Sequence, residues 1–449
     1  MKVQRDGRSF TVEVTADGEG LVSHAGSALL TQVADKTGLT RALSRELAPM
    51  RERRSGHDPG RVLRDLAVML AGGGEALTDI GVLREQAALF GAVASDSTAY
   101  RALKRIAERP ELLDGLRTAH KSARERAWGL GVGPERVTID LDATLVGAHS
   151  EKEGAAGDFK GGFGFHPMLA YLDETSEAAA AMLRPGNAGA NTAADQIAVA
   201  EAALEQIPAA RIEEVDVLLR VDSAGAVHEL LDWAKEGDIR FSVGFDLSEP
   251  VRKAIARIPA RRWVAAQGQD GSPRENGEVC EATNLIDLSG WPQGSRLLVR
   301  RERPHPGAQL SFTDHDGHRF QAILTDQADT DVAALECRHR ARARAEDQIA
   351  DDKDTGLAKL PFRAFAMNEV WLELVLIAHD LLAWTKALLL SGELARSRPK
   401  RLRHRLLHVA ARLAFSGRRA RLRLQAGWPW AAELAAAFEK LKSLPAAAG

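Results

Sequence analysis

The chain of 449 residues is longer than a single compact core usually reaches, so we expect two or more domains around a large core. Hydrophobic residues make up 45% of it and charged residues 27%, which is ordinary for a globular protein and excludes a disordered or membrane-embedded chain. The most apolar segment, residues 370–390, contains four ionisable side chains and so predicts a buried helix, with no membrane contact. The absence of an apolar signal-peptide run at residues 1–6, and two cysteines without metal-ligand spacing, favour a cytoplasmic location.

Residues 1–135 form a mainly helical N-terminal region. Apolar residues recur there at three- and four-residue spacing, which predicts helices over 29–47, 59–72, 77–89 and 98–107. Ser95 to Thr98 is a typical helix start, and the helix that follows carries basic side chains suited to lying along DNA. We interpret this region as a candidate for DNA-end binding; a purely structural helical bundle is the alternative.

The most informative stretch is a strand expected over residues 137–146, rich in β-branched and aliphatic residues. Side chains alternate between the faces of a strand, so Asp140, Asp142 and Thr144 share one face. Two carboxylates on a core-like strand are costly to bury without a partner, and a divalent metal ion is the simplest one. A solvated edge strand is the alternative.

The chain continues as an α/β unit over residues 136–250, which the family resemblance given below makes the first part of a catalytic core. A glycine-rich loop at 155–165, which leads into residues 166–172, is expected to form a hairpin. Further elements are expected in the order strand 178–184, helix 191–207, strand 215–221, helix 227–235 and strand 239–243. Asp222 directly follows the strand 215–221, a position where open α/β sheets place their ligands.

Residues 251–330 change character and predict a β-rich insertion, because short apolar pieces alternate with Gly, Pro and Asp turns. Trp263 and Trp291 lie in it, and an exposed indole there would stack on an unpaired base. Packing in the protein interior is the commoner role of tryptophan.

Residues 331–390 are interpreted as the second part of the core, beginning with a helix over 333–353. One stripe of that helix carries His339, Arg342, Glu346 and Lys353. A solvated face is one interpretation. A single acid within a basic stripe also suits a metal-bound phosphodiester, with Glu346 on the ion and the bases on phosphate oxygens.

The net charge of −2 hides a basic C-terminal region, residues 391–449. Its segment 396–423 contains eleven Lys or Arg residues and no acid, interleaved with apolar residues in a partly helical pattern. We expect a basic helical tail whose counter-charge is nucleic-acid phosphate. Contact with the acidic remainder of the same protein is the alternative.

These motifs together resemble a DDE transposase of bacterial insertion sequences, and most of all the insertion sequence 1380 family. The segments that carry the resemblance are Asp142-Ala143-Thr144 with the glycine-rich loop after it, Leu183 to Thr192, Arg220 to Gly225, and the 333–353 helix running into Leu360-Pro361-Phe362 and Asn368-Glu369-Val370-Trp371. The resemblance implies an α/β, RNase H-like core interrupted by the β-rich insertion, with Asp142, Asp222 and Glu346 as catalytic and metal-binding residues. It further implies DNA-phosphate contacts by His339, Arg342 and Lys353, although the related signature has tyrosine at the position of His339.

The activity implied is binding of terminal inverted repeats, followed by strand cleavage and strand transfer to target DNA. Two Mg²⁺ ions, which Mn²⁺ can replace, would be held by the three carboxylates. The family further implies a homodimer when two ends are paired, acting in the cytoplasm at the nucleoid.

Three alternatives stay open from the sequence. Asp140 competes with Asp142 as the first ligand, because both lie on one strand face. The run from Asp140 to Thr144 also matches the nucleophile motif of haloacid dehalogenase-like phosphatases, in which Asp140 would attack phosphorus and Asp142 would act as acid and base. The third alternative is a transposase-derived DNA-binding protein without catalytic activity.

Overall fold

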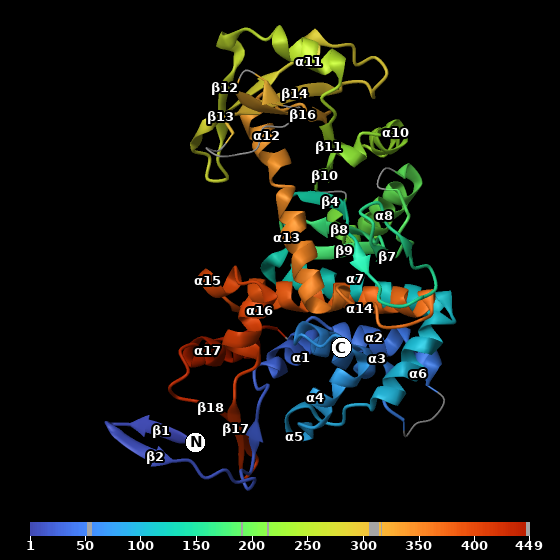
Figure 1. The fold of residues 1–449 in the computed structure, drawn as a ribbon. Helices are drawn as coiled ribbons and strands as arrows, with labels where there is room; N and C mark the ends of the chain where they lie inside the picture. The colour runs from blue at the N-terminus through green and yellow to red at the C-terminus, as the bar shows by residue number, and fades with distance from the viewer. Residues whose placement is uncertain (52–55, 190–191, 213–214, 305–313, 316, 446–449) are drawn as a thin grey trace.

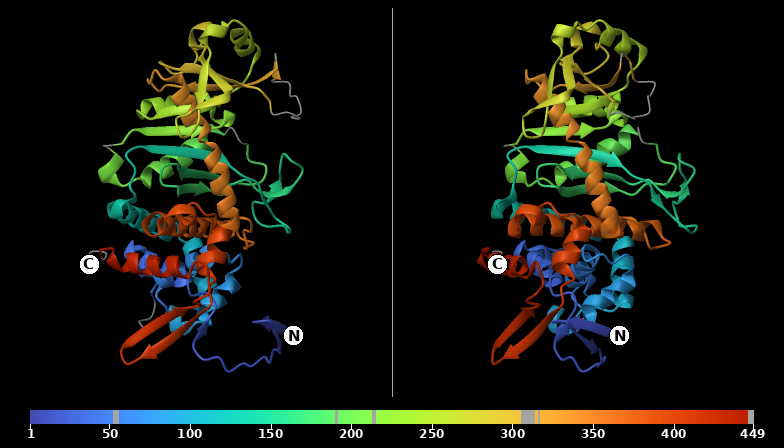
Figure 2. Two further views of the ribbon diagram at one scale, coloured as in Figure 1. Left: turned by 90° about the vertical axis from the view of Figure 1, so that its left-hand side faces the viewer. Right: turned by 60° about the vertical axis from the view of Figure 1, so that its left-hand side comes forward.

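The computed structural model describes residues 1–51, 56–189, 192–212, 215–304, 314–315 and 317–445. The molecule is elongated, with a β-rich region at one end, a sheet with flanking helices in the middle and a helical region at the other end (Figures 1 and 2). No helix within the described ranges is long and apolar enough to cross a membrane.

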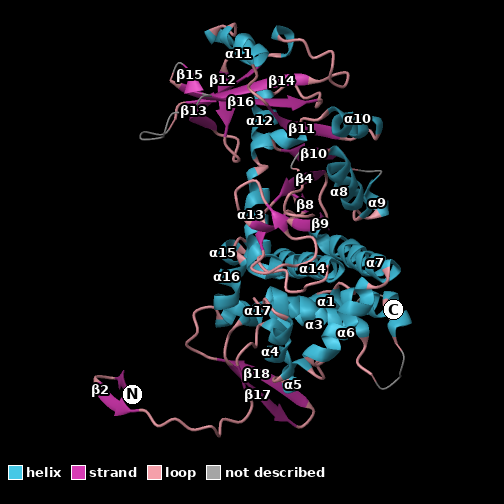
Figure 3. Cartoon of the chain, turned by 45° about the vertical axis from the view of Figure 1, so that its right-hand side comes forward, coloured by secondary structure: helices cyan, strands magenta, loops and turns pink. Residues whose placement is uncertain are grey.

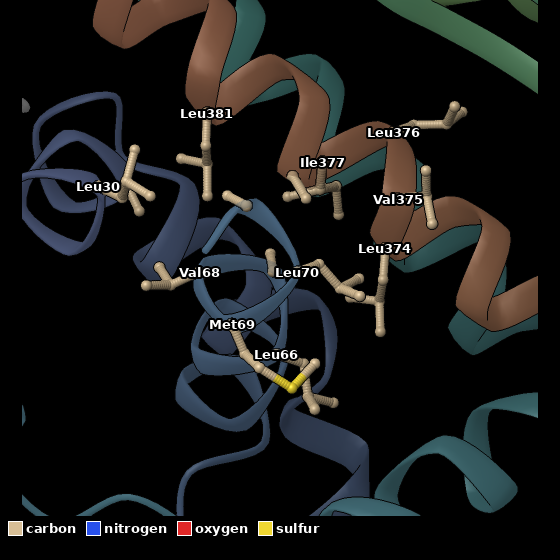
Figure 4. Packing of buried hydrophobic residues seen from close by; sticks show 14 of the residues in the cluster. Leu30, Leu66, Val68, Met69, Leu70, Leu374, Val375, Leu376, Ile377 and Leu381 are labelled. Atoms are coloured by element: carbon tan, nitrogen blue, oxygen red, sulfur yellow. The ribbon is translucent and has the colours of Figure 1, made fainter. Parts of the chain in front are cut away.

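Both ends of the chain build the helical region. The N-terminal helices are α1 (Ser27–Lys36), α2 (Leu39–Glu46), α3 (Pro59–Ala71), α4 (Gly81–Arg84), α5 (Ala87–Phe90), α6 (Asp96–Ala107) and α7 (Pro110–Ala127). They share one apolar core with α14 (Phe365–Leu389) and α17 (Ala431–Ser443). Figure 4 shows the contact between α3 and α14, where Leu66 and Leu70 face Leu374 and Ile377.

The predicted helices of this region are confirmed in type but not always in extent. The helix expected over 29–47 is two helices, because Gly38 between α1 and α2 adopts a φ of +76° that interrupts the helical backbone. The helix expected over 77–89 is three short pieces, a 3-10 turn (Leu77–Ile80) followed by α4 and α5. The α6 start at Ser95 is confirmed, since its side chain accepts from the Thr98 amide.

The central sheet has its strands in the order β11-β10-β4-β8-β9. These are β4 (Val137–Ala143), β8 (Met168–Leu172), β9 (Glu177–Met182), β10 (Val217–Val221) and β11 (Arg240–Phe245). Strands β4, β10 and β11 run parallel, whereas β8 is antiparallel to both of its neighbours. Residues of β8 and β9 alternate between two cores, one shared with α14 and the other with α8 (Ala193–Glu205) and α10 (His228–Glu236). The expected α8 start at Asn191 lies outside the described residues.

The hairpin expected from the glycine-rich loop is confirmed, because β6 (Ala156–Gly157) pairs antiparallel with β7 (Phe163–Phe165). Strand β5 (Val146–Gly147) also pairs with β7 in this small separate sheet, and β8 pairs with β4 and β9. Close backbone approach explains the glycines here, because a Cβ at Gly164 would lie 2.1 Å from the Val146 carbonyl oxygen.

The β-rich insertion extends the central sheet. After α11 (Glu249–Ala256) come β12 (Val264–Gln267), β13 (Pro273–Glu281), β14 (Arg296–Glu302), β15 (Asp314–His315) and β16 (His318–Thr325). Strand β16 pairs antiparallel with β11, so the strands before and after the insertion belong to one ten-stranded sheet. The helix expected over 333–353 then returns as α12 (Val332–Arg340) and α13 (Ala343–Asp352), which run from the insertion down to α14 (Figure 1).

The basic C-terminal region is not helical throughout, which corrects the prediction. Short helices α15 (Gly392–Ala395) and α16 (Pro399–Leu402) and the turn Arg403–Leu407 are followed by a hairpin of β17 (Ala411–Ser416) and β18 (Arg419–Leu424). Residues 419–424 alternate strictly between arginine and small or apolar residues, a period of two that suits a strand. Strand β17 also pairs with β3 (Leu21–Val22), while β1 (Lys2–Arg5) and β2 (Arg8–Thr11) form a hairpin of their own.

Candidate active site

Asp142 and Asp222, the two aspartates of the expected triad, lie at the ends of neighbouring strands, at the same edge of the sheet. Leu141 of β4 lies opposite Val221 of β10 in a parallel pair, and the next residues are Asp142 and Asp222. Each carboxylate is oriented by a backbone amide: Asp142 Oδ1 accepts from Ala143 N at 2.8 Å, and Asp222 Oδ1 accepts from Ala224 N at 2.9 Å. Parallel strands therefore bring together two acids that are 80 residues apart.

The turn after Asp222 depends on tight packing against its neighbours. A Cβ at Gly225 would lie 2.4 Å from the Val221 side chain, and a Cβ at Gly244 of β11 would lie 2.7 Å from the Ser223 amide nitrogen. Neither position has room for a side chain. The close approach of β11 thus fixes where the Asp222 carboxylate sits.

Glu346 reaches the same edge from α13. Arg342, which directly precedes that helix, links it to the strands, with Nη1 3.3 Å from Asp142 Oδ2 and Nη2 3.1 Å from Glu346 Oε1. The Glu346 side chain is 66% exposed. The break between α12 and α13 divides the predicted stripe, since His339 belongs to α12, Glu346 to α13, and Lys353 begins the helical turn Lys353–Leu357.

The electrostatics of Asp142 indicate how near the acids are to one another. Burial raises the pKa of its carboxyl, Arg342 lowers it, and the negative charges of Asp222 and Glu346 raise it further. Three hard oxygen donors that repel one another are the donor set Mg²⁺ prefers. Within the described part of the chain, however, no three acidic, histidine or cysteine side chains are gathered closely enough to hold one ion, and Arg342 pairs with both Asp142 and Glu346.

Asp140, the competing first metal ligand, forms an ion pair with Arg220. It is fully buried, and both of its carboxylate oxygens accept from Arg220 at 2.6 Å. Burial raises its pKa to about 6, and the Arg220 charge opposes that rise. The phosphatase alternative requires Asp140 to attack phosphorus, and a carboxylate that is buried and held at both oxygens is not positioned to do so.

The Asp140–Arg220 pair is part of a larger buried network that the sequence analysis missed. Arg220 also binds Asp173 at 3.1 Å and donates to the main-chain carbonyl of Arg338 in α12. Arg344, in the first turn of α13, donates to both oxygens of Asp173 at 3.0 Å. The network therefore ties the strands that carry the aspartates to the helices that carry His339 and Glu346. A signal was present: Arg220 precedes Asp222 by two residues, as Asp140 precedes Asp142.

His339 and Lys353, the other predicted phosphate ligands, lie on either side of Glu346 in the sequence. His339 bonds Ser242 Oγ through Nδ1 at 2.9 Å, and burial together with the neighbouring charges of Arg220 and Arg342 lowers its pKa to about 3, so its ring is neutral at physiological pH. Burial and nearby Lys160 of the glycine-rich loop lower the pKa of Lys353. Among the described residues, no carboxylate lies within ion-pair distance of Lys353.

A cleft of about 620 Å³ opens beside these residues, between the central sheet, the insertion and α13. Two acids of the triad line it, Asp222 and Glu346. Its other charged lining residues are Asp246, Glu302, Arg274, Arg300, Arg340 and Arg342, so that four acids face four arginines. Arginines suit the phosphates of a phosphodiester backbone, and carboxylates beside them suit a metal ion.

The two tryptophans of the insertion are packed within the protein. The Trp291 ring stacks on His228 with centroids 4.1 Å apart and meets Phe245 edge-on. The Arg301 guanidinium lies 4.2 Å from the centre of the Trp263 ring. Packing is thus the role that the structure gives both rings, and base stacking stays a prediction.

Comparison with known proteins gives the family. The family model described as "Transposase DDE domain group 1" matches residues 4–446. Among solved structures, the chain is similar to the piggyBac transposase of a synaptic complex with hairpin DNA, with a TM-score of 0.39 and 10% sequence identity over 86% of this chain and 79% of that chain. No curated protein matches this chain. The family match spans nearly all of the sequence, and the chain therefore belongs to the DDE transposase family, in its domain group 1.

Proposed function

We propose that this protein is the transposase of an insertion sequence of the 1380 family, which binds the terminal inverted repeats and catalyses metal-dependent strand cleavage and strand transfer. The proposal rests on the placement of Asp142 and Asp222 at the ends of neighbouring parallel strands, with Arg342 bridging Asp142 to Glu346 beside a cleft lined by arginines and acids. The strand order β9-β8-β4-β10-β11, with β4, β10 and β11 parallel, supports an RNase H-like core for this site.

Asp142, Asp222 and Glu346 are the residues that would hold two Mg²⁺ ions, or Mn²⁺ in their place. When bound, such ions supply Lewis-acid stabilisation of the reacting phosphodiester and lower the pKa of an attacking hydroxyl. Arg342 partly neutralises the repulsion between Asp142 and Glu346, and with DNA bound its guanidinium would contact a nonbridging phosphate oxygen. His339 and Lys353 would contact the same backbone, His339 as a neutral ring.

Cleavage of a labelled duplex that carries the repeats flanking the gene tests this proposal. In Mg²⁺, the wild-type protein should nick the repeat boundary, and Asp142→Asn and Glu346→Gln should lose that activity while still binding the duplex. Asp347→Asn is the matched control, because Asp347 is the next residue of α13 and its side chain is 77% exposed. A nick made equally well by Glu346→Gln would sink the triad assignment.

Metal binding has a separate readout that needs no cleavage. Added Mg²⁺ should raise the unfolding temperature of the wild type and of Asp347→Asn, but not of Asp142→Asn, since a ligand that binds only the folded state stabilises it. Repeat binding by a wild type that neither responds to Mg²⁺ nor cleaves would instead indicate the inactive, transposase-derived DNA-binding protein.

We further propose that a homodimer pairs the two ends and acts at the nucleoid. Sedimentation of the protein with a single repeat duplex tests the first part: two protein copies with two duplexes are expected, and one copy on one duplex at all concentrations would contradict it. The α6 helix is a second candidate for end binding, with exposed Arg101 and Lys104 on its surface.

A further inference from the structure

The basic residues of the C-terminal region fall into two groups. Three of those in its first part, Arg398, Lys400 and Arg403, are engaged by the rest of the protein. Arg398 pairs with Asp351 at 2.8 Å, Lys400 with Asp354 at 2.8 Å, and buried Arg403 donates to the Ala71 carbonyl at 3.0 Å. These contacts attach the region to the body of the molecule. Their charges are therefore not available to an external anion.

The arginines of the β17–β18 hairpin form the second group. Its register places Arg412 opposite Arg423, and Arg421 and Arg419 opposite the small residues Ala414 and Ser416. Opposed residues share a face, so Arg412, Arg419, Arg421 and Arg423 lie on one face, which we call the arginine face. All four are exposed, and in the part of the chain that the structure describes none of their guanidinium groups has an ion-pair or hydrogen-bond partner.

The other face of the hairpin explains why the arginine face is held outward. Leu422 and Leu424 pack against a small apolar cluster formed by Val22, Ala25 and Ala411. Strand β17 is also hydrogen-bonded to β3, which fixes the root of the hairpin. The hairpin is thus anchored through one face and presents charge on the other.

Such a row of like charges is unfavourable for the isolated protein. Cationic residues directly opposite each other, such as Arg412 and Arg423, destabilise a strand pair, and no acid lies anywhere in residues 396–423 to offset them. Successive arginines of β18 are about 6.8 Å apart because side chains of one face recur every second residue. A regular line of arginines without counter-charge suits a repeating anion such as a nucleic-acid backbone.

We propose that the arginine face of β17–β18 binds the phosphate backbone of duplex DNA, an inference that rests on the proposed transposase function. The hairpin projects from the helical region, on the side away from the central sheet (Figure 3). It therefore contacts the duplex at a distance from the catalytic carboxylates. Its role is to hold a flanking part of the DNA while the reacting strand lies in the cleft.

The salt dependence of binding to a random-sequence duplex tests this role, measured between about 50 and 200 mM salt. Log K falls as log salt rises, and replacing Arg419, Arg421 and Arg423 together by alanine should make this slope less steep by about 2.7, or about 0.9 for each phosphate that is no longer neutralised. The triple lysine variant should keep the wild-type slope, because lysine retains the charge. The matched control is alanine at three exposed arginines at the opposite end of the molecule, Arg252, Arg257 and Arg261.

Each outcome bears on the proposal. An unchanged slope in the triple alanine variant, or an equal decrease in the control, overturns it even if the wild type binds and cleaves DNA. Failure of the wild type to bind any duplex would instead remove the proposed function. Binding to phosphatidylserine vesicles through these arginines, without binding to duplex, would overturn the proposal in favour of an anionic membrane surface. The unfolding temperatures of the triple lysine variant and of the control should match that of the wild type, since the replaced side chains are exposed. That of the triple alanine variant should be no lower, because the repulsion opposite Arg412 is removed.

Discussion

Arg220 offers the sharpest test of how the site is held together, and the perturbation is Arg220→Met. The guanidinium is fully buried, and its removal leaves the Asp140 carboxylate buried without a counter-charge. Breaking a buried pair from one side typically costs about 3–5 kcal/mol of the free energy of unfolding. Urea unfolding of the variant should show a decrease of that size.

A second substitution separates stability from positioning. In Asp140→Leu/Arg220→Met, two apolar side chains replace the ion pair, so most of the stability should return. The links from Arg220 to Asp173 and to the Arg338 carbonyl do not return, and these links join the strands to α12 and α13.

The rate of DNA cleavage is therefore expected to stay low in the double variant, although its stability is restored. A displacement of reacting groups by about 1 Å costs on the order of 100-fold in rate. We expect a decrease of that order in kcat, with KM for DNA close to the wild-type value because the basic surfaces are intact. Wild-type kcat in the double variant would refute the reasoning and leave the network a purely stabilising role. Arg220→Lys keeps the charge but not the bidentate contact with Asp140, so its kcat should lie between that of the wild type and that of the double variant.

Three further predictions concern other parts of the fold. Burial lowers the pKa of His379, but the Asp352 carboxylate 2.6 Å away raises it overall to about 9. The protonated ring thus stabilises the fold below pH 6.5, and the free energy of unfolding should fall by up to about 3 kcal/mol as the pH rises to 9, a dependence that His379→Gln should flatten. Leu374→Ala should lower that free energy by about 2–5 kcal/mol in urea, because the side chain is fully buried against α3; an unchanged midpoint would contradict this packing. Gly244→Ala should displace the turn after β10 and reduce cleavage, whereas Gly427→Ala, with open space around it, should not; equal rates would show that the turn tolerates a side chain.

The sequence predicted which acids share a strand face, but it did not predict which of them would form an ion pair with an arginine. Alternation along β4 correctly put Asp140 and Asp142 on one face, and for that reason it gave no means of choosing between them. The difference is Arg220, which lies beside Asp140 only because β10 pairs with β4 in one particular register. Register between strands 80 residues apart depends on packing of the whole sheet, which local periodicity does not encode.

The C-terminal hairpin was missed for a different reason. Arginine and leucine favour helices, so a segment rich in both was interpreted by composition. The period-two pattern of residues 419–424 and the Gly417-Arg418 turn, where Gly417 has a φ of +58°, were the better guides. The β-rich character of the insertion was predicted because Gly, Pro and Asp turns bound its short apolar pieces.

The pairing of β16 with β11 also has a consequence for biogenesis. The last strand of the insertion, β16, and the helix that carries Glu346 are both made after the two aspartates, and the apolar core of the helical region needs α14, which is made later still. A nascent chain that ends before α13 thus has both aspartates but no third carboxylate and no completed core. Contacts of such long sequence separation form late in folding. In the proposed mechanism, a prematurely terminated product would accordingly not cleave DNA, because that activity is acquired only once Glu346 and α14 have been made.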